Sequence, residues 1–256
     1  QKYVCVSRPR RFGKSMAIKM LSAYYNSEAD SSKMFRNMEI GSESTCEAYR
    51  NRYEVVLVNM QEFYSSNINM DLMIRKINEG ICHELRKKYP TVEYTDIRSV
   101  VDTMYDIFLS EDRTFIILID EWDCIFREPG CKEDDWRKYL NFLRDWMKDK
   151  PYISLAYMTG ILPVKKYGNH SALNMFTEYS MTNPKRMGEY MGFTSDEVEK
   201  LCARYQMNFE DVKTWYDGYS FEGISSVYSP KSVVECLTNG IFDNYWNQTE
   251  TFEALK

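Results

Sequence analysis

The 256-residue sequence has few of the residue types on which several kinds of functional site depend. It contains only 2 histidines, and its 7 cysteines form no Cys-x-x-Cys pair, so we expect no zinc or iron–sulfur site. The formal net charge is -5, which gives no general attraction to nucleic acid or to an anionic membrane. The apolar runs are far shorter than the roughly 20 residues that cross a bilayer, so we expect no membrane span.

The cysteine pattern also bears on the cellular compartment. Seven is an odd number, and the spacing suggests no disulfide framework, so we expect a reducing, cytoplasmic environment. In that environment Cys5, Cys124 and Cys202 are expected to act as apolar packing residues. The chain starts with Gln1 rather than Met and reaches its first motif almost at once.

The first motif is a short strand followed by a basic turn and a helix. Residues 3–6 (Tyr-Val-Cys-Val) are typical of a strand, and the helix opens at Gly13-Lys14-Ser15. In the pattern G-x-x-x-x-G-K-[ST], backbone N–H groups at the helix start face phosphates, the lysine adds a charge and the hydroxyl ligates Mg²⁺. Arg8 occupies the first glycine position, where glycine allows the turn at no steric cost. A basic loop that merely precedes a helix therefore remains an alternative.

The second motif is a continuous apolar run, residues 115–119, that ends in Asp120 and Glu121. Such a run is typical of a strand buried on both faces of a parallel sheet. Ligands of open α/β sheets bind at strand ends, so Asp120 is predicted to hold Mg²⁺ together with Ser15. Glu121 is predicted to polarise the attacking water as general base. An ordinary exit from a strand into a loop is the alternative.

Four motifs occur along the chain in the order found in one protein family. They are residues 7–15 (Ser-Arg-Pro-Arg-Arg-Phe-Gly-Lys-Ser), 118–123 (Leu-Ile-Asp-Glu-Trp-Asp), 158–161 (Met-Thr-Gly-Ile) and 215–219 (Trp-Tyr-Asp-Gly-Tyr). With them, nearly the whole chain resembles the bacterial AAA-ATPase-like family of P-loop proteins. That family often carries a C-terminal nuclease-like domain of the PD-(D/E)XK type, for which residues 242–256 leave no room. The family also has the Arg-Pro-Arg-Arg-Phe turn, whereas Trp122 stands where it usually has Tyr.

The resemblance implies a fold, cofactors and site residues. The fold is an α/β P-loop NTPase three-layer sandwich with a mainly parallel five-stranded sheet, and the cofactors are ATP and Mg²⁺. The implied catalytic residues are Glu121, Lys14 and Thr159, where Thr159 senses the γ-phosphate; a threonine that caps the next turn is the alternative. The implied nucleotide-binding residues are Pro9, Arg10, Arg11, Phe12, Gly13, Lys14, Ser15 and Met16.

The periodicity of apolar residues predicts alternating strands and helices, as in a layered parallel sheet. The predicted helices span residues 15–26, 71–88, 96–110 and 136–148. The further predicted strands span residues 54–60, 152–158 and 175–182. The resemblance to P-loop ATPases with an extra central strand implies that the strand at 152–158 lies between the phosphate-loop strand and the acidic strand.

We predict a P-loop ATPase-like domain over residues 1–190 and a helical, winged-helix-like lid over residues 191–256. In the lid, Thr194 and Glu197 form a capping box for a helix that ends near residue 205. Asn208 caps a second helix, residues 218–228 form a hairpin with a Glu-Gly turn, and Pro230 opens a last helix. The aromatic motif at 215–219 is expected to anchor the lid chiefly by packing.

Three functions are compatible with these features. The first is a Mg²⁺-dependent, ATP-hydrolysing switch whose lid closes over the nucleotide and whose protein partner is unknown. The second is a degenerate P-loop scaffold that binds a protein or nucleic acid without significant hydrolysis. Nucleic-acid binding as the main role is disfavoured, because acidic residues outnumber the basic residues of the lid. Arg186 is our guess for an arginine that acts on a neighbouring subunit.

Overall fold

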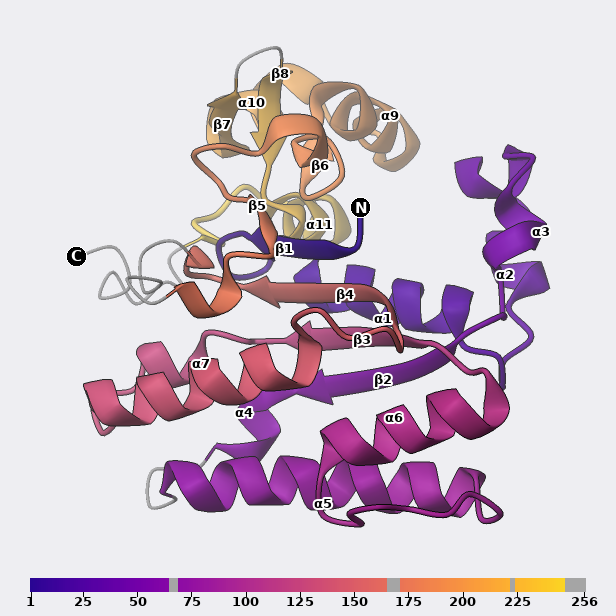
Figure 1. Ribbon diagram of the computed structural model, residues 1–256. Coiled ribbons are helices and arrows are strands. Elements are labelled where there is room, and N and C mark those ends of the chain that lie inside the picture. The colour runs from indigo at the N-terminus through magenta and orange to yellow at the C-terminus, as the bar shows by residue number, and fades with distance from the viewer. Residues whose placement is uncertain (65–68, 165–170, 222–223, 247–256) are drawn as a thin grey trace. The chain divides into compact units, whose positions relative to one another are not determined.

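The computed structural model describes residues 1–64, 69–164, 171–221 and 224–246 (Figure 1). The chain divides into two compact units. Unit 1 comprises Gln1–Cys5 and Ser15–Glu178, and unit 2 comprises Val6–Lys14 and Tyr179–Lys256. The basic turn thus groups with the C-terminal part of the chain. The predicted domain boundary after residue 190 stays a prediction.

A five-stranded sheet with the order β2-β3-β4-β1-β5 forms the framework of unit 1. β2 and β3 pair in parallel, and so do β3 and β4. The strand predicted to separate the phosphate-loop strand from the acidic strand is β4, and the sheet order confirms that position. The strands are β1 (Tyr3–Ser7), β2 (Glu54–Asn59), β3 (Phe115–Asp120), β4 (Ile153–Gly160) and β5 (Thr177–Tyr179).

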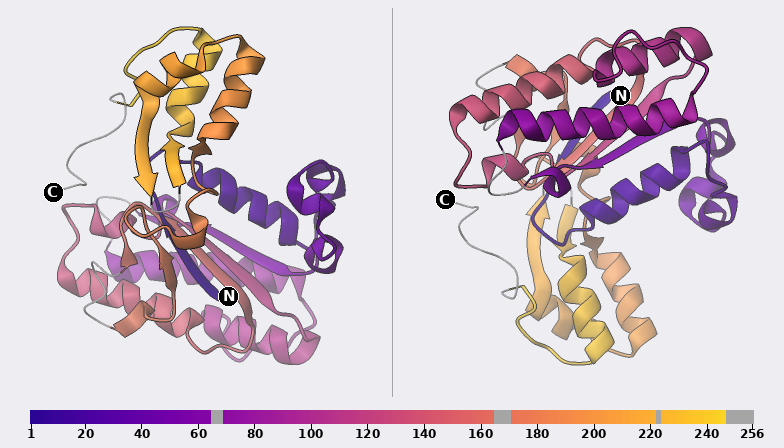
Figure 2. Two further views of the ribbon diagram at one scale, coloured as in Figure 1. Left: turned by 90° about the horizontal axis from the view of Figure 1, so that it is seen from above. Right: turned by 90° about the horizontal axis from the view of Figure 1, so that it is seen from below.

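β3 is buried along its whole length, because helices cover both faces of this sheet. One face of β3 carries Phe115, Ile117 and Ile119, which share a core with α5, α6 and α7. Because side chains alternate along a strand, Ile116 and Leu118 point to the opposite face. Figure 2 shows α1 on that opposite face. The three-layer α/β fold is therefore confirmed. The helices named here are α1 (Lys14–Tyr25), α5 (Met70–Lys88), α6 (Val100–Glu111) and α7 (Glu133–Met147).

Side-chain caps decide where two of these helices begin. The Asn69 side chain accepts a hydrogen bond from the N–H of Leu72 at 2.8 Å, and α5 starts at the residue after the cap. α6 begins at Val100 rather than at residue 96 as predicted, because Ser99 caps it and residues 96–99 form a turn instead. The remaining short helices of unit 1 are α2 (Ser32–Phe35), η1 (Glu39–Ser42), α3 (Cys46–Tyr49), α4 (Met60–Phe63), η2 (Cys124–Phe126) and η3 (Ser171–Leu173).

The bounds of the last two strands differ from those predicted. β4 continues two residues further than predicted, to Gly160. β5 is shorter than the predicted span of 175–182, because turns on both sides take up its backbone groups. On one side the N–H of Phe176 bonds to the carbonyl of Leu173, and on the other the N–H of Asn183 bonds to the carbonyl of Ser180.

Unit 2 contains a three-stranded antiparallel sheet with the order β6-β8-β7 and three helices packed on it. The predicted capping box is confirmed, since the N–H of Thr194 bonds to the Glu197 carboxylate at 2.8 Å. Asn208 caps the next helix as predicted, and the predicted Glu-Gly turn lies outside the described residues. The elements are η4 (Lys185–Met187), β6 (Phe193–Thr194), α9 (Ser195–Tyr205), α10 (Phe209–Tyr216), β7 (Asp217–Phe221), β8 (Ile224–Tyr228) and α11 (Pro230–Asn239).

A buried carboxylate ties together the two segments that follow β3 and β4. Asp123 is fully buried, and its Oδ2 accepts hydrogen bonds from the N–H groups of Ile161 at 3.0 Å and Leu162 at 2.8 Å. A side chain at Gly160 has no room, because a Cβ there would lie 2.5 Å from Asp123 Oδ1 and 2.6 Å from Trp122 Nε1. This packing fixes the end of the sheet where the acidic motif lies.

Replacing Asp123 with alanine should lower the free energy of unfolding by about 2–4 kcal/mol, since the N–H groups of Ile161 and Leu162 lose their acceptor and Arg127 loses an ion-pair partner. Urea denaturation measures this loss. Asp145→Ala, which removes an exposed carboxylate from α7, is the matched control and should change stability by less than about 0.5 kcal/mol. Equal losses in the two variants would contradict the structural role of Asp123.

Candidate functional site

The arginine at the first glycine position of the phosphate-loop pattern points into the protein. Arg8 is 0% exposed, and its Nη1 donates hydrogen bonds to the carbonyls of Ser7 at 3.0 Å and Tyr179 at 2.9 Å. Its Nη2 donates to the carbonyl of Met187 at 3.1 Å. The guanidinium therefore anchors the turn to the segment that follows β5, and it does not crowd the face where a ligand would lie.

The turn itself contains two residues with an uncommon backbone conformation. Arg11 and Gly13 have positive φ angles of 68° and 81°, in the left-handed region. The place of a Cβ at Gly13 is open, so glycine is favoured there by the backbone conformation and not by a close neighbour. Alternation of left- and right-handed residues turns successive N–H groups toward one side, which is how anion-binding turns are built.

The lysine at the start of α1 is Lys14. Its side chain is 5% exposed, and its Nζ donates a hydrogen bond of 2.8 Å to the carbonyl of Pro9 across the turn. No acidic residue stands in the first turn of α1 to compete with a bound anion. Ser15 and Met16 follow in that first turn, and both side chains are exposed. Their predicted contacts with a nucleotide stay predictions.

At the end of the acidic strand, two predicted site residues meet. Thr159, on β4, is 0% exposed and donates a hydrogen bond from its hydroxyl to Oδ1 of Asp120, at the end of β3. The N–H of Glu121 donates to the same oxygen at 3.0 Å. Within the described residues, no hydrogen bond or ion pair is made to Oδ2 of Asp120, which is 5% exposed as a residue. A carboxylate oxygen in this position, at the end of a strand, suits a hard cation such as Mg²⁺.

The predicted general base is engaged in an ion pair that the sequence analysis did not identify. Glu121 has a φ of 52°, and its carboxylate pairs with Nη2 of Arg127. Arg127 also lies 3.3 Å from Asp123, measured from Nε to Oδ2. Burial raises the pKa of the Asp123 carboxyl, although Arg127 and the neighbouring N–H groups favour its ionised form. Arg127 therefore couples the proposed base to a buried carboxylate.

The only signal for Arg127 in the sequence is its spacing. Asp123 and Arg127 are four residues apart, a separation at which opposite charges meet on one turn. That spacing is common on protein surfaces, so it did not single out this pair. Arg186, our guess for a residue that acts on a neighbouring subunit, donates from Nε to the hydroxyl of Tyr179 at 3.2 Å. Its role stays a prediction.

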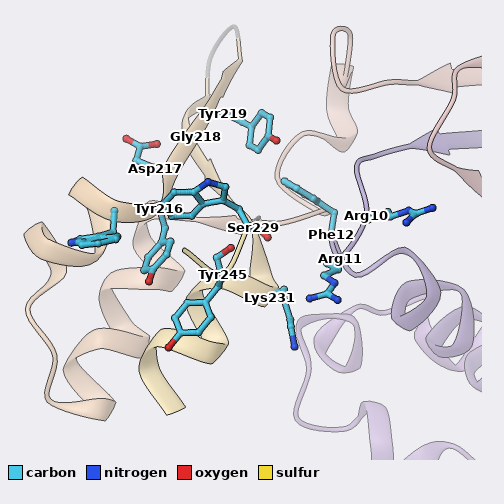
Figure 3. A pocket seen from close by; sticks show the side chains of 13 residues that line it. Arg10, Arg11, Phe12, Tyr216, Asp217, Gly218, Tyr219, Ser229, Lys231 and Tyr245 are labelled. Atoms are coloured by element: carbon cyan, nitrogen blue, oxygen red, sulfur yellow. The ribbon is translucent and has the colours of Figure 1, made fainter. Parts of the chain in front are cut away.

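Unit 2 contains a cavity of about 300 Å³ beside the basic turn (Figure 3). We call it the aromatic pocket. Phe12 meets Tyr219 edge to face, with the ring centroids 5.3 Å apart. The predicted nucleotide-binding turn and the aromatic motif at 215–219 thus line one cavity. Its lining consists of Arg10, Arg11, Phe12, Trp215, Tyr216, Asp217, Gly218, Tyr219, Ser229, Lys231, Ser232, Tyr245 and Trp246.

The predicted site residues fall into two groups. Asp120, Glu121 and Thr159 lie together in unit 1, and the turn from Pro9 to Lys14 lies in unit 2. Their convergence on one ligand stays a proposal. In the part of the chain that the structure describes, no three His, Cys, Asp or Glu side chains are grouped so as to hold a metal by themselves. No described helix is long and apolar enough to cross a membrane.

Known proteins offer three comparisons. An uncharacterised protein from the vnfD 5′ region of Azotobacter chroococcum mcd 1 is 21% identical over 96% of this chain, which spans only 47% of that relative. Orc1 of Aeropyrum pernix, solved in complex with DNA, is 11% identical and has a TM-score of 0.35, with 79% of this chain and 43% of that chain covered. Drosophila ORC, solved with AT-rich DNA and Cdc6, is 14% identical and has a TM-score of 0.31, with 79% and 71% covered.

The comparison with family models decides the classification. The model of the AAA-ATPase-like family, described as predicted AAA-ATPases, matches residues 1–168, which include the basic turn, the acidic strand and Thr159. The match covers more than half of the chain and confirms the resemblance found in the sequence motifs. This chain is a member of the AAA-ATPase-like family.

Proposed function

We propose that this chain binds ATP with Mg²⁺ at the Gly13–Ser15 turn and hydrolyses it as a molecular switch. The observation that carries the proposal is the buried contact between Asp120 and Thr159, which leaves one carboxylate oxygen for a cation. Membership of the family supports ATP as the ligand. The open turn at Gly13, with Arg8 directed inward, supports a place for the phosphates.

Each residue has a distinct part in the proposed reaction. N–H groups of the turn and the Lys14 ammonium bind the phosphate oxygens, and Lys14 exchanges its bond to Pro9 for one to the ligand. Asp120 and Ser15 would hold Mg²⁺, which neutralises charge on the β- and γ-phosphates when bound. Thr159 orients Asp120.

The chemical step needs a base close to the attacking water. The water oxygen bonds to the γ-phosphorus, the bond from that phosphorus to the bridging oxygen breaks, and the proton of the water passes to Glu121. Glu121 is paired with Arg127 in this structure. Before it accepts the proton, the Glu121 carboxylate therefore has to leave Arg127 or to keep that ion pair through only one of its two oxygens. This requirement makes slow basal hydrolysis the expected behaviour.

The same ion pair supports a second candidate function. If Arg127 held Glu121 permanently, the chain would bind nucleotide without turning it over, and the bound state itself would be the signal read by a partner. The two functions share the binding site and differ only in the fate of the γ-phosphate. They are therefore separated by measuring phosphate release.

Binding of ATP with Mg²⁺ should raise the melting temperature, and Lys14→Ala should remove the rise. A ligand at about a hundred times its Kd adds roughly 2.7 kcal/mol of stability, which corresponds to roughly 5–10 °C for a chain of this size. Thermal melting with and without nucleotide measures the shift. Lys19→Ala, an exposed lysine of the same helix, is the control and should keep the full rise. A rise that persists in Lys14→Ala would disprove the assigned site.

Glu121→Gln should lower steady-state phosphate release by at least about a hundredfold and leave ATP binding intact, because the amide cannot accept the proton of the water. Glu128→Gln, in the same loop, should release phosphate at the wild-type rate. Equal, background-level release from the wild type and Glu121→Gln would exclude hydrolysis and favour the binding-only function.

A further inference from the structure

The aromatic pocket of unit 2 presents flat, apolar faces that are held in place from behind. Trp215 stacks on Phe242 with ring centroids 6.0 Å apart and an angle of 24° between the planes. It is nevertheless 45% exposed, a large exposed area for a tryptophan. Tyr219 and Phe12 form another wall, in edge-to-face contact.

Two of the three tyrosines that line the pocket, Tyr216 and Tyr245, use their hydroxyl groups for internal hydrogen bonds. The Tyr216 hydroxyl donates to the carbonyl of Asp243 at 2.9 Å and accepts from the N–H of the same residue at 3.1 Å. The Tyr245 hydroxyl donates to the carbonyl of Ile241 at 3.2 Å. Both rings are thus fixed at their polar ends, and they contact each other with centroids 6.3 Å apart, so they hold the pocket wall in place behind the exposed Trp215.

Positive charge lies at one end of the pocket. Figure 3 shows the side chains of Arg11 and Lys231 on the same side of the cavity. Lys231 is paired with Glu235, and this contact, with a smaller contribution from Arg11, lowers the pKa of the Glu235 carboxyl. Glu235 balances Lys231, so the charge of Arg11 remains at this end of the pocket to attract an anionic group, although the Asp217 carboxylate also lines the pocket.

We propose that the aromatic pocket binds the base of the nucleotide whose phosphates occupy the adjacent turn. The inference rests on the proposed function and adds to it the subsite that holds the base. Its basis is that Arg11 and Phe12, which line the pocket, directly precede Gly13 and Lys14, the predicted phosphate contacts. A single ligand with a planar aromatic ring and a phosphate chain satisfies both parts of this loop.

The size of the cavity selects a mononucleotide among ligands of this chemistry. About 300 Å³ is at the lower limit for small-molecule sites, which is room for one base with its sugar. An oligonucleotide would need a longer basic groove with several stacking positions. Asp217 and the acidic residues of the neighbouring helix α10 also disfavour a chain of phosphates along this surface.

The experiment compares ATP with inorganic tripolyphosphate, which has the phosphates and lacks the base. Isothermal titration with Mg²⁺ present gives the Kd of each ligand for the whole chain. Trp215→Ala should weaken ATP binding about tenfold to a hundredfold, the range for loss of one stacked base, and leave tripolyphosphate binding unchanged. Trp215→Phe, which keeps an aromatic face, should restore ATP affinity to within about threefold of the wild type.

A second variant guards against misfolding of Trp215→Ala. Ser229 lines the pocket and makes no side-chain cap to α11, so Ser229→Phe should fill the cavity and weaken ATP binding at least tenfold without affecting tripolyphosphate. Tyr105→Ala, on the exposed side of α6, is the control and should bind both ligands normally.

The outcomes separate this inference from the proposed function. ATP affinity that is unchanged in both Trp215→Ala and Ser229→Phe would overturn the base subsite while leaving the phosphate site in place. The base subsite would also be overturned if both variants lost affinity for ATP and for tripolyphosphate to the same extent. A wild-type chain that binds neither ligand would overturn the proposed function, and the base subsite with it.

Discussion

A fully buried guanidinium fixes the turn on which both proposed binding sites depend. Arg8 gives three hydrogen bonds to backbone carbonyls from three places in the chain, and each carbonyl is part of unit 2. Burying a charge without partners costs several kcal/mol, so this arrangement is stable only while all of these acceptors stay in place. The shape of the loop is consequently linked to the fold of the C-terminal part of the chain. A glycine at this position would allow the turn but would supply none of that linkage.

At the acidic end of β3, negative charges lie close together in the chain, whereas at Arg8 a single positive charge is buried. Asp120, Glu121 and Asp123 place three carboxyl groups within four residues, and Arg127 is a direct partner for two of them. A third carboxylate close to these two in the chain is stabilised by a second cation near Asp120. Under the proposed function, the Mg²⁺ ion that accompanies the triphosphate would supply it. The arrangement of Arg127 thus leaves the charge of Asp120 for the ligand to balance.

Local sequence patterns predict the structure correctly where neighbouring residues determine it. The unbroken apolar run before Asp120 predicted a strand buried on both faces, and the Thr194–Glu197 spacing predicted a helix start that the backbone follows. Such patterns are less accurate where distant residues compete for backbone groups, as at both ends of β5, whose neighbouring turns could not be inferred from alternation alone. The inward direction of Arg8 and the pairing of Arg127 with Glu121 depend on acceptors brought close by folding. Periodicity carries no information about such contacts. The sequence of a basic loop does not show whether its arginine side chains face the ligand or the core.

The loop between β1 and α1 is shared by the two parts of the proposed nucleotide site. Phe12 packs on Tyr219 of the lid, and two residues later Lys14 bonds back to Pro9. A phosphate that draws Lys14 away from Pro9 acts on the same short backbone as a base that stacks in the aromatic pocket. Two ligand groups that bias one element are thermodynamically coupled, so each strengthens the binding of the other when both favour the same loop shape. In that case loss of the γ-phosphate would be felt at Tyr219 through Phe12, which gives the hairpin of β7 and β8 a direct physical means to report the state of the nucleotide.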